Sequence, residues 1–496
     1  MKSKLRLRWA TLVAVCLALT SLVPMPAQGQ NKTVSNLRYR IFDVGTFGGP
    51  TSQTNGSRIL NNEGVVAGEA DTAKPCPFYG GFASLISPAF RWKNGKLTNI
   101  GVLPHGCFSL PNGISRNGFI AGSSDNGIID PNTGVPEIRA DFRANGHMFN
   151  LGTFGGTNSL ANDVNDHGIA VGGAENKDPD PFNFGGNLLG LPSPTAWQGF
   201  LWQGHGLKKL GTLGGPDSFA LIVNQRDEIS GISFTNSVVN PTTELPTTAA
   251  FFWKNGKMRN IGSFGGVFST MSYLNDKSQV VGFSTFPGDF VGHAFVWAPD
   301  TGMKDLVTLG GTFSTAIWVN NSGIAVGGST TLNDELFIAA RWRNGAIENL
   351  GTAGGNTCSN AFQISERGEV AGQSFNCDNT GLAHATLWEP TGPAIDLNRF
   401  LPPDSNLQLA EAHFVNDRGE LVVVGILPNG NPHIVVMVPC TGSESEGCRG
   451  AREDASVAQQ QLAFGNNHTR LSPENLAAIK RRAIRKFRGF PGVNQN

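Results

Sequence analysis

Six serines recur at one position of a repeated sequence, and serine is the first residue type to test for nucleophilic chemistry. Each stands six residues before the first residue of a polar turn: Ser109, Ser159, Ser218, Ser269, Ser314 and Ser359. No histidine pairs with these six equivalent serines at a fixed spacing, and the sequence has no Gly-x-Ser-x-Gly elbow. We therefore expect these serines to be structural, and we expect no catalytic residues.

Histidines and carboxylates were tested next as metal ligands. His293, His384 and His433 recur at one strand position, and a repeated position favours packing or capping over a metal. The sequence has no His-Glu-x-x-His and no phosphate loop. Asp178 and Asp180 in "KDPDP" offer calcium ligands, but the prolines and the missing partner Glu argue against such a site. We expect no metal and no cofactor.

The elements that position these residues are short strands in a repeat. The glycine-rich turn "LGTFGG" at Leu151 returns six times, once degraded, and an Asn-x-x-Gly-like turn occurs eight times. Between the turns lie apolar runs such as "GIAVGG" and aromatic runs such as "AFFW" at Ala250, which are typical of strands. Gly is 64 of 496 residues, and only 15% are charged. Four short antiparallel strands per unit predict an all-β propeller.

The two ends of the repeat region suggest how the array closes. The run "RYRIFDVG" at Arg38 resembles a fourth strand without a blade, and the last unit, ending at Pro439, has three strands. Pairing of Arg38–Val44 with the segment around Ile434 would remove two exposed sheet edges. We expect a closed propeller with this N-terminal strand completing the last blade. Eight blades are predicted, with seven as the alternative if the irregular second copy is not a blade.

Successive strands of each unit run in opposite directions, so the loops that connect them alternate between two faces. The glycine turns and the loops between strands two and three share one face, and the Asn-x-x-Gly turns share the other. The two–three loops are long in the first four units, at 69–87, 123–137, 174–198 and 234–248. Aromatic residues in these loops offer surfaces for stacking on sugars: Phe78, Tyr79, Phe182, Phe184 and Trp197. The alternative is that they pack their own loops.

The six cysteines that follow the N-terminal segment are candidates for disulfides. Parity places Cys358 and Cys377 on neighbouring strands at the glycine-turn face, and Cys76 and Cys107 share that face. Cys440 and Cys448 flank "TGSESEG" and would close a small loop. Free thiols are the alternative.

Together these elements resemble the HAF-repeat family, the probable extracellular repeat proteins of bacteria. The resemblance rests on "LGTLGG" at Leu210, the turn-plus-strand "NNSGIAVGG" at Asn320 and "HAFVW" at His293, and it covers roughly residues 36–439. It implies secretion and a propeller-like array, and it implies no catalytic residues.

Both termini differ from the repeat region. Residues 1–29 read as a signal peptide, with Lys2, Lys4, Arg6 and Arg8 before an apolar run; an uncleaved anchor is the alternative. Residues 440–496 form a basic tail with one short helix expected from Ser472. Its cations Lys480, Arg481, Arg482, Arg485, Lys486 and Arg488 would contact either the acidic repeat region or an anionic membrane surface, or the tail stays solvated.

The expected function follows from these features. A secreted (extracellular or periplasmic), non-enzymatic scaffold would bind a glycan or a surface protein through the face carrying the long loops. An acidic repeat region with a basic tail is unlike a nucleic-acid-binding domain, so no nucleic acid is expected. The alternative is a polysaccharide hydrolase or lyase with acidic residues in the central channel. A purely structural surface protein is a third reading.

Overall fold

The structure is a computed structural model that describes residues 37–54, 56–78, 85–191, 193–241, 243–440, 447–452 and 474. The predicted signal peptide (1–29) and nearly all of the basic segment from Ser472 lie outside the described residues. In the described part of the chain, no helix is long and apolar enough to cross a membrane.

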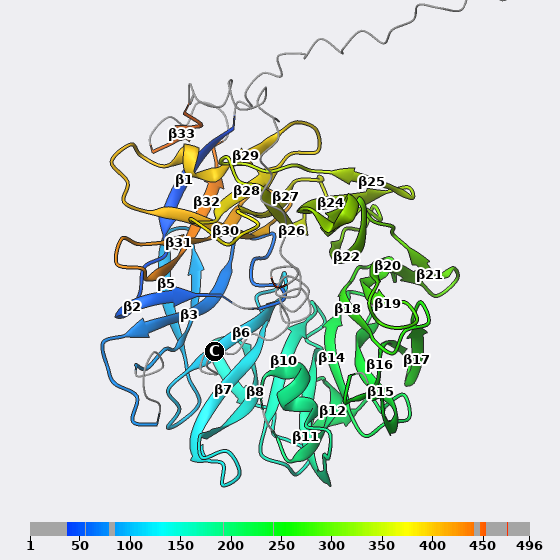
Figure 1. Cartoon of the computed structure of the whole chain (residues 1–496). Helices are drawn as coiled ribbons and strands as arrows, with labels where there is room; N and C mark the ends of the chain where they lie inside the picture. The colour runs from blue at the N-terminus through cyan, green and yellow to red at the C-terminus, as the bar shows by residue number, and fades with distance from the viewer. Residues whose placement is uncertain are drawn as a thin grey trace, which may run out of the picture. The chain divides into compact units, whose positions relative to one another are not determined.

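The regular secondary structure of the described chain is nearly all β-strand. The strands form eight repeat units of four antiparallel strands each, which Figure 1 shows in chain order. The first four units are β2 (Gly48–Gln53), β3 (Val66–Thr72), β4 (Ala89–Lys93) and β5 (Lys96–Gly101); β6 (Ser109–Ile114), β7 (Ile120–Ile129), β8 (Pro136–Ala144) and β9 (His147–Asn150); β10 (Ser159–Val164), β11 (Ala170–Pro179), β12 (Thr195–Trp202) and β13 (Leu207–Lys209); and β14 (Ser218–Val223), β15 (Ile229–Val239), β16 (Pro246–Lys254) and β17 (Lys257–Gly262).

The next three units are β18 (Ser269–Leu274), β19 (Val280–Thr285), β20 (Gly292–Ala298) and β21 (Gly302–Asp305); β22 (Gly310–Val319), β23 (Ala325–Thr331), β24 (Phe337–Arg343) and β25 (Ala346–Asn349); and β26 (Cys358–Ile364), β27 (Val370–Phe375), β28 (His384–Trp388) and β29 (Ala394–Asp396). The eighth unit is β30 (Gln408–Val415), β31 (Leu421–Ile426), β32 (Pro432–Pro439) and β1 (Arg38–Asp43). One parallel pair, Gly292 with Phe313, joins the fifth and sixth units into a single eight-stranded sheet. None of the described sheets closes on itself.

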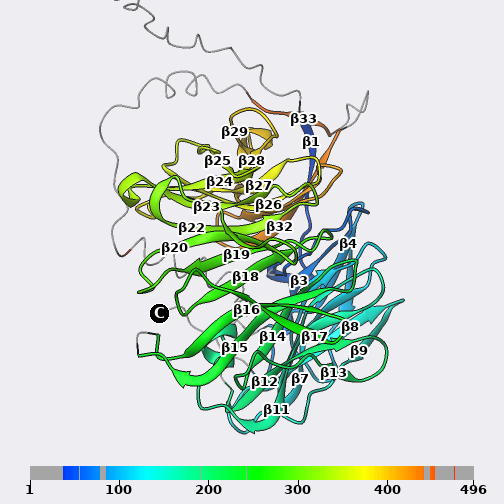
Figure 2. The ribbon, with the colours of Figure 1, turned by 90° about the vertical axis from the view of Figure 1, so that its right-hand side faces the viewer.

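The predicted pairing between the first strand and the last unit of the repeat region is confirmed. In β1, Phe42 lies opposite Val436 of β32 and Asp43 lies opposite Val435. The backbone N–H of Val44 continues the ladder, donating to the carbonyl of Ile434 at 2.8 Å. One strand more than expected follows: β33 (Arg449–Gly450) pairs with the other edge of β1, as Figures 1 and 2 both show.

The recurring serines connect neighbouring units. Ser159 accepts a hydrogen bond from the backbone N–H of Ala140 in the preceding unit at 2.9 Å and donates to the carbonyl of Gly152 at 2.7 Å. Four other units repeat both bonds, through Ser218, Ser269, Ser314 and Ser359. Each hydroxyl thus ties a third strand to the glycine turn that leads to the next unit. This is a structural role, as the sequence predicted.

The glycine turn needs two glycines for two different reasons. Gly155 has φ of +110°, a backbone conformation that a side chain disfavours. Gly156 has no room for a side chain, because a Cβ there would lie 2.4 Å from the Cβ of Glu175. The turn therefore crosses between sheets only where side chains are absent.

The core lies between neighbouring sheets. Val281 and Ala294 of the fifth unit pack against Ala316 and Trp342 of the sixth, and all four are buried. In most units an aromatic or aliphatic residue of the third strand covers the buried glycine of the second, as Phe295 covers Gly282.

The second unit departs from this pattern. Asp141 stands opposite Gly122, and Arg143 follows where six of the other units have tryptophan and the eighth has Met437. Both are buried, with Arg143 Nε 3.1 Å from Asp141 Oδ1. Burial raises the pKa of Asp141 to about 6, with Arg143 opposing the shift. An ion pair thus replaces the aromatic core of this unit.

The long two–three loops are partly strand. In the second unit β7 and β8 form a long hairpin, and only residues 130–135 lie between the two strands. In the third unit the π-helical turn η2 (Gly185–Leu189) fills the loop. These segments are long, as predicted, but part of each is strand in the second, third and fourth units, since backbone pairing resumes there after an irregular register. Two short 3-10 turns complete the fold, η3 (Leu332–Asp334) and η4 (Leu397–Phe400).

Candidate functional site: the pocket inside the ring of polar turns

The turns between first and second strands meet in one place. Each turn begins with Asn or Ser, and the carbonyl oxygen of the Asn side chain holds its own turn: Asn165 accepts from the backbone N–H groups of His167 and Ile169. The Asn side-chain N–H reaches the next unit, where Asn224 donates to the carbonyl of Asn275 at 2.9 Å and Asn275 to that of Asn320 at 2.8 Å. Successive turns therefore lie side by side.

A second series of hydrogen bonds uses the residue after each turn Asn or Ser. We call these eight residues the rim: Asn62, Arg116, Asp166, Gln225, Asp276, Asn321, Glu366 and Asp417. The backbone N–H of seven of the eight rim residues donates to the side chain of the next, as from Gln225 to Asp276 at 2.8 Å and from Asp276 to Asn321 at 2.9 Å. The other five links repeat this geometry.

The series joins every pair of neighbouring units except the first and the second. The backbone N–H of Asp417 donates to Asn62 Oδ1 at 3.0 Å, linking the eighth unit to the first. Arg116 carries only donors, so it has no oxygen to offer the N–H of Asn62. Its Nε lies instead 3.6 Å from Asp166 Oδ2. The rim therefore holds four carboxylates against one guanidinium.

All eight rim residues line a pocket of about 200 Å³. Deeper in it lie Arg58, Tyr273 and Trp318. The rings of Tyr273 and Trp318 are stacked, with centroids 3.6 Å apart and an interplanar angle of 20°. The pocket thus combines an aromatic surface with a mouth of amide and carboxylate oxygens.

Arg58 comes from an irregular segment after β2 and lies against the inner strands of the second and third units. Its backbone N–H donates to the carbonyl of Asn112 at 3.1 Å, and its Nη2 donates to Asp163 Oδ1 at 2.9 Å. Burial opposes the charge of Arg58, but Asp163 outweighs it, so the pKa of Arg58 is raised. Burial also raises the pKa of Tyr273 despite the nearby guanidinium. At neutral pH the interior therefore offers a paired cation and a neutral phenol.

The rim carboxylates repel one another. Burial raises the pKa of Glu366 above its usual range; the backbone N–H of Asn321 opposes this shift, and Asp417 and Asp276 add to it. Both oxygens of Glu366 lie 3.0 Å from that N–H. Because a cation in the mouth would relieve this repulsion, the site favours positively charged groups over anions.

Two of the aromatic residues predicted for a ligand face on the opposite side are buried. Phe184 and Trp197 are fully buried, at 0% exposure, and cannot stack on a ligand. Phe184 packs on Phe234 with centroids 5.1 Å apart, and Trp197 on Phe219 at 6.0 Å.

Of the remaining three aromatic residues of that prediction, the two in the described part of the chain are not fully buried. Phe182 and Phe78 are half-buried, and Phe182 also packs on Phe234. Tyr79 lies outside the described residues. The prediction of a ligand face was therefore wrong for the two buried rings, because the side chains fill the space between their own loop and its neighbours.

The other candidate residues have structural partners. His293, His384 and His433 each pair with an aspartate, the last with Asp43 at 2.9 Å. Asp180 accepts the backbone N–H groups of Phe182 and Phe184 and so holds its own loop. Asp178 accepts from the Asn176 amide at 2.7 Å. In the part of the chain that the structure describes, no group of three metal-binding side chains occurs.

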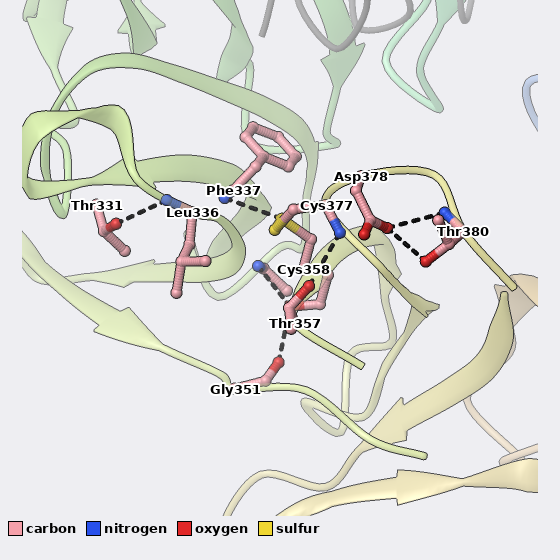
Figure 3. Close-up of a disulfide and its surroundings, with 11 residues drawn as sticks. Thr331, Leu336, Phe337, Gly351, Thr357, Cys358, Cys377, Asp378 and Thr380 are labelled. Atoms are coloured by element: carbon pink, nitrogen blue, oxygen red, sulfur yellow. Dashed lines mark hydrogen bonds between the residues drawn. A yellow bond between two sulfur atoms is a disulfide. The ribbon is translucent and has the colours of Figure 1, made fainter. Parts of the chain in front are cut away.

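Three disulfides join the predicted cysteines: Cys76–Cys107, Cys358–Cys377 and Cys440–Cys448. Figure 3 shows the second, where the backbone N–H of Phe337 from the preceding unit points at Cys358 Sγ, 3.2 Å away. Cys377 donates its N–H to Thr357 at 2.9 Å. Disulfides of this kind are typical of proteins that fold in an oxidising compartment.

Sequence reasoning missed the rim, although a signal was present. The position after each turn Asn or Ser is polar in all eight copies, and seven of the eight side chains carry an acceptor oxygen. A turn position has no need of such a side chain. Its recurrence indicated a shared partner in the neighbouring unit.

Comparison with known proteins gives a loose likeness. No protein-family model and no curated protein matches the chain. The β-propeller domain of the Trilobed protease from Pyrococcus furiosus is 10% identical, with a TM-score of 0.39 over 76% of this chain and 91% of that one. An acylaminoacyl peptidase from Pyrococcus horikoshii is 9% identical, with a TM-score of 0.41 over 85% of this chain and 55% of that one. The polysaccharide lyase Uly1 is 9% identical, with a TM-score of 0.39 over 81% and 97%.

Proposed function

We propose that this protein is an exported, non-enzymatic binding scaffold that takes an amine-bearing glycan in the pocket inside the rim. Its eight units would be the blades of one closed propeller. The link from Asp417 to Asn62, and the return of the chain ends to one sheet through β1 and β32, support closure. Export is supported by the three disulfides and by the N-terminal sequence.

The chemistry of the pocket supports this ligand class. Sugar rings stack on aromatic faces, and Tyr273 and Trp318 supply an aromatic surface there. The rim supplies acceptors for hydroxyl groups. Four carboxylates against one guanidinium favour an ammonium group, which aromatic rings also attract. The observation that carries the proposal is the coexistence of the stacked pair and the acidic rim in one pocket.

Binding of glucosamine oligosaccharides to the full chain, measured by titration calorimetry, tests this function. Trp318→Ala and Glu366→Gln should each weaken binding at least tenfold, about 1.4 kcal/mol. Phe149→Ala, an exposed aromatic outside the pocket, is the matched control and should leave affinity unchanged. Absence of binding to amine-bearing sugars, or binding untouched by both pocket variants, would refute the proposal.

A second function, a polysaccharide hydrolase or lyase, is favoured by the four rim carboxylates. Enzymes of the first kind use two carboxyl groups flanking the scissile bond. Against it, Asp166, Asp276, Glu366 and Asp417 each accept a backbone N–H of the preceding unit, which gives these side chains a structural reason to recur. Release of reducing ends or of unsaturated products from glucosamine polymers, abolished by Glu366→Gln, would establish the enzyme and overturn the binding scaffold.

A further inference from the structure

We infer that the basic C-terminal segment of this chain, residues 472–488, binds in the acidic mouth of the rim and competes there with external ligands. The inference rests on the pocket of the proposed function, but it concerns a different occupant. It begins from the excess of carboxylates over cations in the rim. Of the four rim carboxylates, only Asp166 has a guanidinium partner in the rim.

A cation in the mouth would offset the repulsion between the rim carboxylates. The raised pKa of Glu366 reflects burial together with repulsion from Asp417 and Asp276. Arg58, the cation deeper in the pocket, is already 2.9 Å from Asp163. Its charge also acts on Asp276 and Asp166. A positive group entering from solvent would therefore chiefly meet Glu366 and Asp417, which have no guanidinium partner in the rim.

The C-terminal segment has the matching chemistry. Between Lys480 and Arg488 six of nine residues are basic and none is acidic. Phe487 and the aliphatic side chains of that run give it apolar surface as well. Lysine and arginine bind carboxylates by charge-assisted hydrogen bonds and lie favourably on aromatic rings, so the mouth and the Tyr273–Trp318 pair both suit this segment.

A long stretch of chain precedes the basic run. The described body ends at Arg452, whose N–H is held by the carbonyl of Arg399 at 3.0 Å. From there to Lys480 are 28 residues by position, which span roughly 90 Å when extended and about 30 Å on average as a flexible chain. A tethered segment of this length acts at an effective concentration on the order of a millimolar, so even a weak site would be largely filled.

Zero-length cross-linking of the full chain with a carbodiimide tests the contact directly. The reagent joins a lysine amine to a carboxylate only when the two touch, so mass spectrometry should find Lys480 or Lys486 joined to Asp276, Glu366 or Asp417. Mixing heavy- and light-labelled protein should show the link within single chains. Lys254 and Glu228, 2.8 Å apart, are an internal positive control that every variant should retain.

Matched variants separate charge from reactivity. Lys480→Arg with Lys486→Arg keeps the charge and should abolish the cross-link while leaving ligand affinity unchanged. Arg481→Gln, Arg482→Gln and Arg485→Gln together should reduce the cross-link several-fold and tighten the binding of glucosamine oligosaccharides at least tenfold.

The outcomes are distinguishable from failure of the proposed function. Rim cross-links without any sugar binding would sustain this inference and refute the glycan ligand. Sugar binding that is indifferent to the tail substitutions, with no rim cross-link, would overturn the inference and keep the scaffold. Cross-links only between chains, or sedimentation of the tail with anionic vesicles in place of the rim contact, would also overturn it.

Discussion

Asn416 and Asn61 are 355 positions apart in sequence, yet the side-chain N–H of Asn416 donates to the backbone carbonyl of Asn61 at 3.0 Å. The same bond joins Asn224 to Asn275 and Asn275 to Asn320, between units adjacent in sequence. One interaction therefore serves both as a link between neighbours and as the link between the last unit and the first. A repeated asparagine thus does more than form a turn.

Replacing Asn416 tests how much its hydrogen bonds contribute to the free energy of unfolding. Asn416→Ala removes the donor to Asn61 and the acceptor for the N–H groups of Arg418 and Glu420, so unfolding should become easier by about 2–3 kcal/mol at about 1 kcal/mol per bond. Urea unfolding followed by tryptophan fluorescence measures the change. Asn429→Ala, in an exposed turn where the side chain accepts only from Asn431, should cost much less. Equal losses in the two variants would contradict the closing role.

The histidine–aspartate pairs predict a pH dependence of stability. The hydrogen bond to Asp43 raises the pKa of His433, although burial opposes it, and that of His384 is raised in the same way by Asp396. A folded pKa above the unfolded value near 6.5 means stability that is full below that pH and is lost as pH rises through the folded pKa. The urea midpoint should therefore fall from pH 6 to pH 8.5.

The control for this effect removes the titrating group while leaving the strand intact. His433→Gln should flatten part of the pH dependence, and the double substitution with His384→Gln should flatten more of it. His205→Gln, at an exposed position, should leave the slope unchanged. A slope that survives the double substitution would show that other groups carry it.

The buried ion pair of the second unit predicts an asymmetry between single and paired substitutions. Arg143→Ala leaves Asp141 buried beside Gly122 without its partner and should destabilise the fold by about 3–5 kcal/mol. Asp141→Phe combined with Arg143→Trp restores the residue types of the other units and should cost far less or be stabilising. Thermal unfolding of both variants compares them. A double variant as unstable as the single one would show that the ion pair is required.

Removal of each disulfide should lower the free energy of unfolding by an amount that grows with the length of the loop it closes. Removing Cys358–Cys377 by paired alanines frees a loop with a sequence separation of 19 and should cost about 3 kcal/mol in the chain-entropy model. Cys440–Cys448, with a separation of 8, should cost less, and Cys76–Cys107, with a separation of 31, should cost more. Chemical unfolding of the three double-alanine variants gives the order. The reverse order would indicate native-state effects in place of loop entropy.

The repeat was predictable because its signals are local. Apolar alternation, aromatic runs and Asn or Gly turns each reflect backbone preferences within a few residues, so four strands per unit could be read without a structure. The pairing of β1 with β32 was also predictable, since an incomplete unit at one end and an extra strand at the other leave matching edges.

The candidate site was not predictable to the same degree. Phe184 and Trp197 lie in a segment that the sequence predicted to be a loop, and sequence gives no measure of whether such a segment folds back on its own rings. The pocket draws residues from all eight units, with Arg58, Tyr273 and Trp318 separated by 45 residues or more. No local pattern connects them.

By itself the sequence determined the strand periodicity, the residues at each turn and the cysteines available for pairing, because these depend on short-range geometry. Only the tertiary structure decided which side chains face the rim, which aromatics are buried and where carboxylates crowd together. Those properties arise from burial and from charges brought together across distant units, and neither exists in the chain until the sheets are side by side.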